Sequence, residues 1–378
     1  MKTGGKMGRV DRIIVCALLL AAAMLAAGCG GTRDDRGTQT EAAKESKPRI
    51  GIVFDSYVIE RWERDRDIFT STAQELGADV LVGNANGDPQ EQKKVIQHMI
   101  DSKVEVLVII AIDGSELSGS VDSAHKAGIP VISYDRIIEN ADTDLYITFD
   151  NYKVGEYMAQ AINAALPDGG TYMELCGSPT DHNVDMVQEG FDGAIGDSMT
   201  MIDTMSCTNW DDTEAFDYLT KHVEDLTGAD AFMCGNDSIA GQVVRALAER
   251  RLAGKKIVTG QDADLAACQR IVEGTQTVTI YKPIEKLAGQ AARVAVEMAD
   301  GKQPETDETI SDGSYEIPYI AISPIAVSED NLDAVIIQSG FHNREDVYLH
   351  VGDAGSTENM ENAESTEKTE NPESTETE

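Results

Sequence analysis

Charged and polar residues follow strand-like hydrophobic segments at several places in the sequence. The segment 130–136, PVISYDR, ends in Asp135 and Arg136. Neighbouring side chains of an extended chain point to opposite faces, so this acid and this base are poorly placed to pair with each other. They can instead bind a ligand, Asp135 accepting from hydroxyl groups and Arg136 donating to them. The alternative is that each serves a surface ion pair or a helix cap. Other residues of interest follow strand-like segments in the same way: Trp210, Asn236, Asp237, Gln261 and Asp262.

The segments that position these residues alternate between strand and helix patterns from Pro48 onward. Nearly continuous hydrophobic strands, such as 104–112, are typical of parallel strands buried on both faces. The alternation restarts after 144–150, which predicts two α/β lobes, each a doubly wound parallel sheet covered by helices. Ligands of such sheets bind beyond the carboxyl ends of the strands, so the residues above should face a cleft between the lobes.

The amino-terminal segment predicts export. Basic residues come first, an apolar run, IIVCALLLAAAMLAA, follows, and Gly28 and Cys29 end the pattern. This arrangement resembles a bacterial lipoprotein signal peptide over 1–28, with Cys29 as the lipidated first residue of the mature protein. An uncleaved membrane anchor is the alternative. Either form places the rest of the chain outside the cytoplasm and tethers it to a membrane.

Composition limits the remaining function classes. The chain's 378 residues leave room for two domains, and a hydrophobic content of 41% is enough to build their cores. A formal charge of −36 argues against nucleic-acid binding. Residues 29–47 predict a flexible linker, and 351–378 predict a disordered acidic tail.

No motif of catalysis or of cofactor binding stands out. The sequence lacks a G-x-S-x-G elbow, a P-loop and a GxGxxG after a strand, and its histidines are scattered without ligand spacing. We therefore predict no enzyme activity, no cofactor and no metal. Asp237 is expected to cap the following helix rather than to bind ligand. Four body cysteines, which lack metal-like spacing, could form disulfides or remain buried thiols: Cys176, Cys207, Cys234 and Cys268.

Several strings in order resemble one family over about 48–345. They are ERWERDRDIF, NANGD, VLVIIAIDG, YDR, ITFDN, CGSPTDHN, GND, GQDADLA, GTQTVTIYKPI and SGFHNRE. Together they are similar to the D-xylose-binding proteins of bacterial ABC transporters, which are periplasmic sugar-binding proteins of the ribose-binding type. The resemblance implies a type I periplasmic-binding-protein fold whose lobes are joined by three crossovers. It implies a first lobe of 48–150 with 281–302, and a second lobe of 151–280 with 303–350.

The resemblance also implies the ligand-binding residues. By motif they are Arg61, Trp62, Asp135, Arg136, Asn183, Trp210, Asn236, Asp262 and Lys282. Trp210 is the least secure placement, because the segment before it is shorter than in the family. A pyranose has flat C–H faces and a rim of hydroxyls, which suits two indoles and fixed charges. The alternative is that both tryptophans belong to the core.

The resemblance implies a lipid-anchored receptor that captures D-xylose or a related aldose for an ABC permease. A second interpretation is a sugar sensor that docks on a membrane histidine kinase. A repressor with related lobes would need a basic helix-turn-helix segment where this chain has an export signal.

Overall fold

The computed structural model describes residues 47–59 and 61–351. The predicted signal peptide, the lipidation site Cys29, nearly all of the linker and nearly all of the tail lie outside the described residues. Among the residues that are described, no helix combines the length and the apolar character needed to cross a bilayer.

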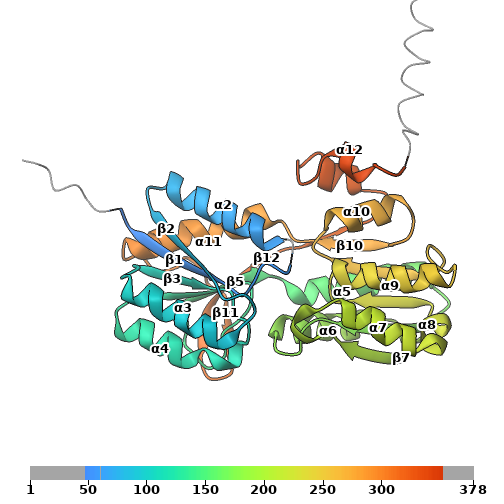
Figure 1. Cartoon of the computed structure of the whole chain (residues 1–378), viewed down its shortest axis with the longest axis horizontal. Coiled ribbons are helices and arrows are strands. Elements are labelled where there is room, and N and C mark those ends of the chain that lie inside the picture. The colour runs from blue at the N-terminus through green and yellow to red at the C-terminus, as the bar shows by residue number, and fades with distance from the viewer. Residues whose placement is uncertain (1–46, 60, 352–378) are drawn as a thin grey trace, which may run out of the picture. The chain divides into compact units, whose positions relative to one another are not determined.

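The first sheet has seven strands in the order β11-β12-β5-β4-β3-β1-β2 (Figure 1). Its strands run parallel except at the antiparallel pair β11–β12. Three of them, β3, β4 and β5, are buried along their whole length, as expected for a sheet covered on both faces. The strands are β1 (Arg49–Phe54), β2 (Asp79–Asn84), β3 (Val106–Ile109), β4 (Val131–Tyr134), β5 (Leu145–Phe149), β11 (Thr309–Ser311) and β12 (Glu316–Ile322).

Helices cover both faces of this sheet. Phe69 of α2 and Leu287 of α11 share a core with Ile52 of β1. Ile96 of α3 shares a different core with Val53, the next residue of the same strand. Since successive strand side chains point to opposite faces, α2 and α11 lie on one face and α3 on the other, together with α4. The helices are α2 (Arg61–Glu75), α3 (Pro89–Asp101), the 3₁₀ turn η1 (Gly114–Glu116), α4 (Ser118–Lys126) and α11 (Ile284–Ala299).

The second sheet has six strands in the order β13-β10-β9-β8-β6-β7. Only β13 runs antiparallel to its neighbour among the pairs described. Met233 and Phe232, adjacent in β8, enter two different cores, one shared with α5 and α6 and the other with α7 and α9. The strands are β6 (Gly170–Cys176), β7 (Met199–Ser206), β8 (Ala231–Cys234), β9 (Ile257–Gln261), β10 (Val278–Tyr281) and β13 (Ile325–Val327).

The helical segments of this second half follow the predicted pattern with one break. Residues 213–226 have the sequence pattern of one continuous helix. In the structure this helix divides at His222, whose φ of −109° and ψ of 53° are not helical. The segments are α5 (Asn151–Ala165), α6 (His182–Ala194), η2 (Thr208–Trp210), α7 (Thr213–Lys221), α8 (Val223–Gly228), α9 (Asp237–Glu249), α10 (Leu265–Val272), the π turn η3 (Asp333–Ile337) and α12 (Arg344–Val347).

The chain crosses between the two sheets three times, after β5, after β10 and after β12. One predicted boundary is wrong. The family resemblance implied that 303–350 belongs to the second lobe. In the structure β11 and β12 extend the first sheet, where Tyr319 pairs in register with Tyr146 of β5. The reason is that β5 would otherwise leave its outer edge unpaired, and a late strand completes it. The antiparallel β13 closes the edge at β10 in the second sheet.

Candidate functional site

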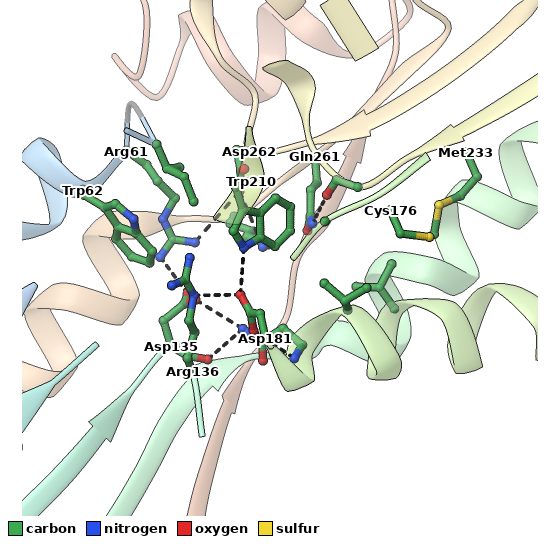
Figure 2. Close-up of a pocket in the computed structure, with 17 residues that line it drawn as sticks. Arg61, Trp62, Asp135, Arg136, Cys176, Asp181, Trp210, Met233, Gln261 and Asp262 are labelled. Carbon is green, nitrogen blue, oxygen red and sulfur yellow. Dashed lines mark hydrogen bonds and ion pairs between the residues drawn. The ribbon is translucent and has the colours of Figure 1, made fainter. Parts of the chain in front are cut away.

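Arg61 begins α2 and points into a cavity at the carboxyl ends of the strands (Figure 2). Its side chain is only 4% exposed. The guanidinium donates to Asp135 Oδ2 at 2.8 Å and to Asp65 Oδ2 at 3.2 Å, and its Nη1 lies 3.9 Å from Asp262 Oδ1. Arg61 therefore joins carboxylates that come from three separate parts of the chain.

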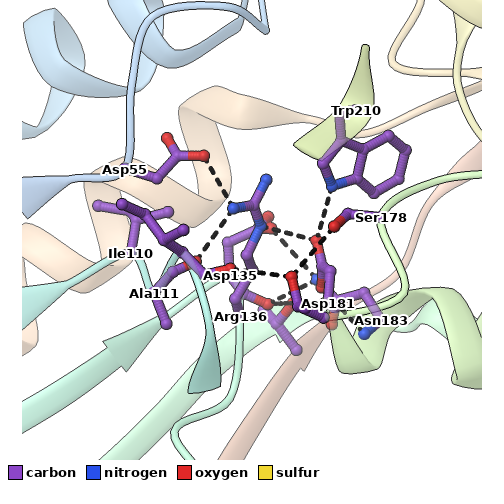
Figure 3. A network of polar contacts seen from close by, with 12 residues as sticks. Asp55, Ile110, Ala111, Asp135, Arg136, Ser178, Asp181, Asn183 and Trp210 are labelled. Atoms are coloured by element: carbon purple, nitrogen blue, oxygen red, sulfur yellow. Dashed lines mark hydrogen bonds and ion pairs between the residues drawn. The ribbon is translucent and has the colours of Figure 1, made fainter. Parts of the chain in front are cut away.

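Asp135 and Arg136 diverge just after β4, at a left-handed turn in which Asp135 has a φ of 65°, so their opposite directions come from this turn and not from the extended chain that the sequence predicted. Asp135 faces Arg61, whereas Arg136 Nη1 donates to Asp55 Oδ2 at 2.8 Å and to the carbonyl of Ala111 at 3.0 Å. Arg136 Nε also forms an ion pair with Asp181 Oδ2 at 2.7 Å (Figure 3). The two neighbours thus belong to two different charge networks at one cavity.

Asp262 and Lys282 reach the cavity from the ends of β9 and β10. Lys282 Nζ lies 3.5 Å from Asp262 Oδ1, so Asp262 stands between Lys282 and Arg61. The neighbouring Gln261 donates through Nε2 to the carbonyl of Gly235. Arg61, Asp262 and Lys282, which we call the cavity triad, form a row of alternating charge across the two halves of the fold.

Several site residues hold their backbone in the left-handed region, which side chains other than glycine avoid. The φ angles are 65° at Asp135, 62° at Trp210 and 98° at Asp262. Such conformations cost about 1–3 kcal/mol each and persist where the surrounding structure enforces them. Their concentration at one cavity is typical of a functional site.

The two tryptophans both line the cavity. Trp62 is 1% exposed, and the guanidinium carbon of Arg61 lies 4.4 Å from its ring centroid. Trp210 donates from Nε1 to Asp181 Oδ2 at 3.2 Å. In the view of Figure 2 the guanidinium groups of Arg61 and Arg136 separate the two indoles. Each tryptophan also has a core side, because Trp62 packs edge-on against Phe54 and Trp210 packs against the core that Phe232 belongs to.

All of the predicted ligand-binding residues except Asn236 line this cavity, which encloses about 500 Å³ of atom-free space, counting the part open to solvent. Asn236 instead caps α9, its Oδ1 accepting from the Ile239 amide at 2.9 Å. The predicted cap, Asp237, has a different position, where its carboxylate accepts from Thr279 and Gln276, both at 2.7 Å. The sequence could not tell which of the two neighbours is the cap, because either residue type can cap a helix. A ligand contact by Asn236 stays a prediction.

Asn183 lines the cavity but its amide is already bonded to protein. Its Oδ1 accepts from Tyr146 at 3.0 Å and from Asn151 at 2.9 Å, while its Nδ2 donates to the Asp135 carbonyl at 3.0 Å. These bonds connect α6 with the ends of β4 and β5. Asn183 therefore fixes the backbone of Asp135, in addition to its predicted role toward ligand.

Four side chains that matter at the cavity were not among the predicted ligands: Asp55, Asp65, Asp181 and Gln261. Gln261 was singled out by its position at a strand end but was not among the ligands that the family resemblance implied, and Asp55, which follows β1, could have been indicated in the same way. Asp65 lies one helical turn after Arg61, at the spacing of an i, i+4 pair. Nothing in the sequence indicated Asp181, because its partners Arg136 and Trp210 come from distant segments.

The pKa values of two carboxyl groups at the site, Asp135 and Asp181, are shifted in opposite directions. Burial alone would raise the pKa of the Asp135 carboxyl, but attraction from Arg61, Lys282 and Arg136 outweighs it and holds the pKa below its ordinary value. Burial raises the pKa of the Asp181 carboxyl above its ordinary value, despite the opposing attraction of Arg136. Asp135 is therefore a firmly fixed anion at the centre of the cavity.

The body cysteines do not resemble a metal site or a redox pair. Cys176, Cys207 and Cys234 are buried free thiols, and the buried Cys268 lies with its Sγ 3.6 Å from the Ala263 carbonyl. Across the described part of the chain, no group of three or more potential ligands could hold a metal ion.

The fold and the cavity correspond to a known class. A family model described as a periplasmic binding protein domain matches residues 50–303. The chain belongs to this family of periplasmic binding proteins. Its fold is accordingly type I, with two parallel-sheet α/β lobes, and its relatives bind substrates rather than convert them, so it is not an enzyme.

Particular relatives narrow the class further. The chain is 38% identical to the D-xylose-binding periplasmic protein of Haemophilus influenzae over 82% of this chain and 95% of that one. It is 39% identical to the D-xylose-binding periplasmic protein of Escherichia coli, covering 81% of this chain and 94% of that one. Among solved structures, a carbohydrate transporter solute-binding protein of Chloroflexus aurantiacus in complex with D-glucose has a TM-score of 0.72 and 26% identity. That alignment covers 80% of this chain and 98% of that one.

Proposed function

We propose that the cavity binds one monosaccharide, D-xylose or a closely related aldose, outside the cytoplasm, and that the chain delivers it to an ABC permease. The proposal is supported by the similarity to two D-xylose-binding proteins along nearly their whole length. It is also supported by the lining of the cavity, in which two indoles accompany fixed charges of both signs.

Polar atoms without hydrogen bonds carry this proposal. Trp62 Nε1, Gln261 Oε1 and Asp262 Oδ1 are buried at the cavity and have no hydrogen-bond partner. A buried polar group left in this state costs about 1–3 kcal/mol. One of these atoms is a donor and two are acceptors. A sugar hydroxyl both donates and accepts, so hydroxyls arranged around a ring can satisfy all three at once.

The charged groups explain why a neutral ligand suits a site of this kind. Every guanidinium and ammonium group of the cavity already has a carboxylate partner, so the ligand need not supply a charge. Hydrogen bonds from charged groups to hydroxyls are worth about 1.5–3 kcal/mol each. A sugar that lacks one of the matched hydroxyls leaves a buried partner unsatisfied and is rejected.

Calorimetric titration with pentoses and hexoses tests the proposal directly. We expect D-xylose to release heat and to bind more tightly than its epimers. At 100 times its Kd it should stabilise the folded state by about 3 kcal/mol, which a thermal melt records as a rise in Tm. Trp210→Ala should weaken binding, whereas Tyr315→Ala, at an exposed position of the β11–β12 hairpin, should not. Absence of heat from every monosaccharide refutes the proposal.

The membrane attachment and the permease are separate parts of the proposal. We expect Cys29 to carry lipid, so that cells expressing the chain incorporate a labelled fatty acid into it and Cys29→Ser abolishes the label. With a reconstituted ABC permease encoded beside this chain, the sugar-loaded protein should stimulate ATP hydrolysis. If it instead activates only a membrane histidine kinase, the transport role is wrong and the sensor interpretation holds.

A further inference from the structure

The late segment SGFHNRE, residues 339–345, was part of the family resemblance but has no role in the site described above. The segment connects η3 to α12 and includes the first two residues of α12, and none of its residues lines the cavity. Phe341 and His342 within it are buried, each 7% exposed. Buried aromatic and imidazole groups in a short connection indicate that the connection is held against the body of the protein rather than left in solvent.

The contacts of this segment lie directly behind the cavity triad. Arg64, one helical turn after Arg61, donates to the Phe341 carbonyl at 2.9 Å, and its guanidinium carbon lies 4.4 Å from the Phe341 ring. His342 Nε2 lies 2.8 Å from the carbonyl of Ala263, the residue that follows Asp262.

The third contact completes the pattern. The Phe341 ring packs on Tyr281, the residue before Lys282, with ring centroids 4.7 Å apart. Each member of the triad Arg61, Asp262 and Lys282 thus has a close neighbour in sequence that touches 341–342. Phe341 and His342 do not line the cavity themselves, so they contact these three neighbours outside it.

The contact between His342 and Ala263 lies at a strained turn. Asp262 and Ala263 are consecutive residues with φ angles of 98° and 56°, a strained turn that presents Asp262 to the cavity. The turn is also tied by the Ala263 amide, which donates to Thr279 Oγ1 at 3.0 Å. The bond from His342 holds the carbonyl side of the same residue. Strain of this kind is retained only where several such ties act together.

The hydrogen bonds determine the state of His342. A carbonyl oxygen can only accept, so Nε2 carries a proton. The Nδ1 atom faces Arg64 Nη2 at 3.4 Å, and because a guanidinium can only donate, Nδ1 is the unprotonated nitrogen. The ring is therefore neutral, with both nitrogens engaged. A second proton would place an N–H group and a positive charge against Arg64.

We propose that residues 339–345 form a brace for the ligand cavity, and that His342 is a positioning residue that holds the Asp262 turn in its binding geometry. The inference rests on the proposed sugar-binding function. Its consequence is that protonation of His342 detaches the brace, frees Asp262 from the triad and lowers sugar affinity.

The charged groups around His342 favour this direction of the pH effect. Arg64 opposes protonation, Asp346 of α12 favours it, and Glu285 of α11 lies in the same surface hollow. Burial, first, and Arg64 lower the pKa of His342 below its ordinary value of 6.5, against the opposing effects of the Ala263 carbonyl and Asp346. As the pH falls below 6.5, the detached segment binds a proton more readily than the docked one. The contact of residues 339–345 with the Asp262 turn is therefore complete above pH 6.5 and is weakened as the pH falls through this value.

The test is calorimetric titration of the full chain with D-xylose at pH 7.5 and pH 5.5. We expect wild-type affinity to fall severalfold at pH 5.5. His342→Gln, which can still donate and accept but cannot titrate, should bind equally at both pH values. His342→Ala should bind about tenfold more weakly at pH 7.5. His98→Gln removes an exposed histidine of α3 and should behave as wild type.

Two binding results would overturn the proposal. One is a wild-type pH dependence that His342→Gln retains in full, and the other is a His342→Ala variant with unchanged affinity and only a lowered Tm. Hydrogen exchange of the unliganded protein distinguishes failure of the brace from failure of the sugar assignment. If the brace exists, His342→Ala speeds exchange at the Ala263 and Asp264 amides even when wild type binds no monosaccharide, and unchanged exchange there refutes it.

Discussion

Gly177 offers the sharpest test of how the second lobe presents Trp210. The residue follows β6, and its φ is not left-handed, so alanine fits its backbone. A Cβ at Gly177 would lie 2.2, 2.4 and 2.5 Å from three ring atoms of Trp210. Gly177→Ala therefore perturbs one contact, between the strand end and the indole, and leaves the charges of the cavity unchanged.

The size of the effect follows from the contact distance. Carbon atoms pack at about 3.5 Å or more, so the indole must retreat by roughly 1.3 Å. The bond from Trp210 Nε1 to Asp181 Oδ2 is already 3.2 Å long, near the upper limit for an N–H···O bond, and such a shift breaks it. Overpacking of this kind costs about 1–3 kcal/mol. If the displaced indole loses a similar ~1–3 kcal/mol of its contact with the ligand, affinity becomes about fivefold to 150-fold weaker.

Three measurements on Gly177→Ala check this reasoning. D-Xylose affinity by calorimetry should fall as stated, Trp210 emission should change in a Trp62→Phe background, and Tm should also fall, because the clash is present in the unliganded protein. Gly193→Ala is the matched control, because it adds the same atom to α6 of the same lobe where nothing lies within 4 Å. It should bind as wild type and stabilise the helix by up to about 1 kcal/mol. Unchanged affinity and emission for Gly177→Ala would show that the indole does not meet the ligand as we describe.

Three further predictions concern the charges. Arg136→Ala should destabilise the unliganded protein by about 3–5 kcal/mol, since it leaves Asp55 and Asp181 buried without their partner, and urea unfolding measures this; a loss below 1 kcal/mol contradicts it. Asp262→Gly and Asp262→Ala should both weaken sugar binding. The free energy of unfolding should be about 1 kcal/mol higher for the glycine variant than for the alanine variant, because glycine tolerates the φ of 98°, and equal stabilities would argue against strain. The folded pKa of Asp135 lies below its unfolded value, so its contribution to stability is full above pH ~4 and lost as the pH falls further. Asp135→Asn should remove that part of the acid sensitivity in urea melts between pH 5 and pH 2.5, and an unchanged profile would contradict the assignment.

Sequence patterns were most informative where each element's role depends on its own residues. The segment 104–112, which contains β3, is hydrophobic at every position except Glu105 because both faces of the sheet are covered, and this property is visible without the partners. The separation of Asp135 and Arg136 was expected from an extended segment, but the structure produces it by a left-handed turn at Asp135 after the end of β4. The late strands β11 and β12 were missed because the residues that select their position belong to β5, more than 150 residues earlier.

By itself the sequence determined the α/β class, the repeated lobes, and most of the residues that gather at the strand ends. It determined these because periodicity and strand ends are local properties, and parallel strands bring their carboxyl ends to one edge. Only the tertiary structure decided which residues pair there. The carboxylate of Asp181 between Arg136 and Trp210 and the contact of His342 with Ala263 both join segments far apart in the chain. Pairings of this kind depend on distances set by the packing of whole lobes, which no single segment encodes.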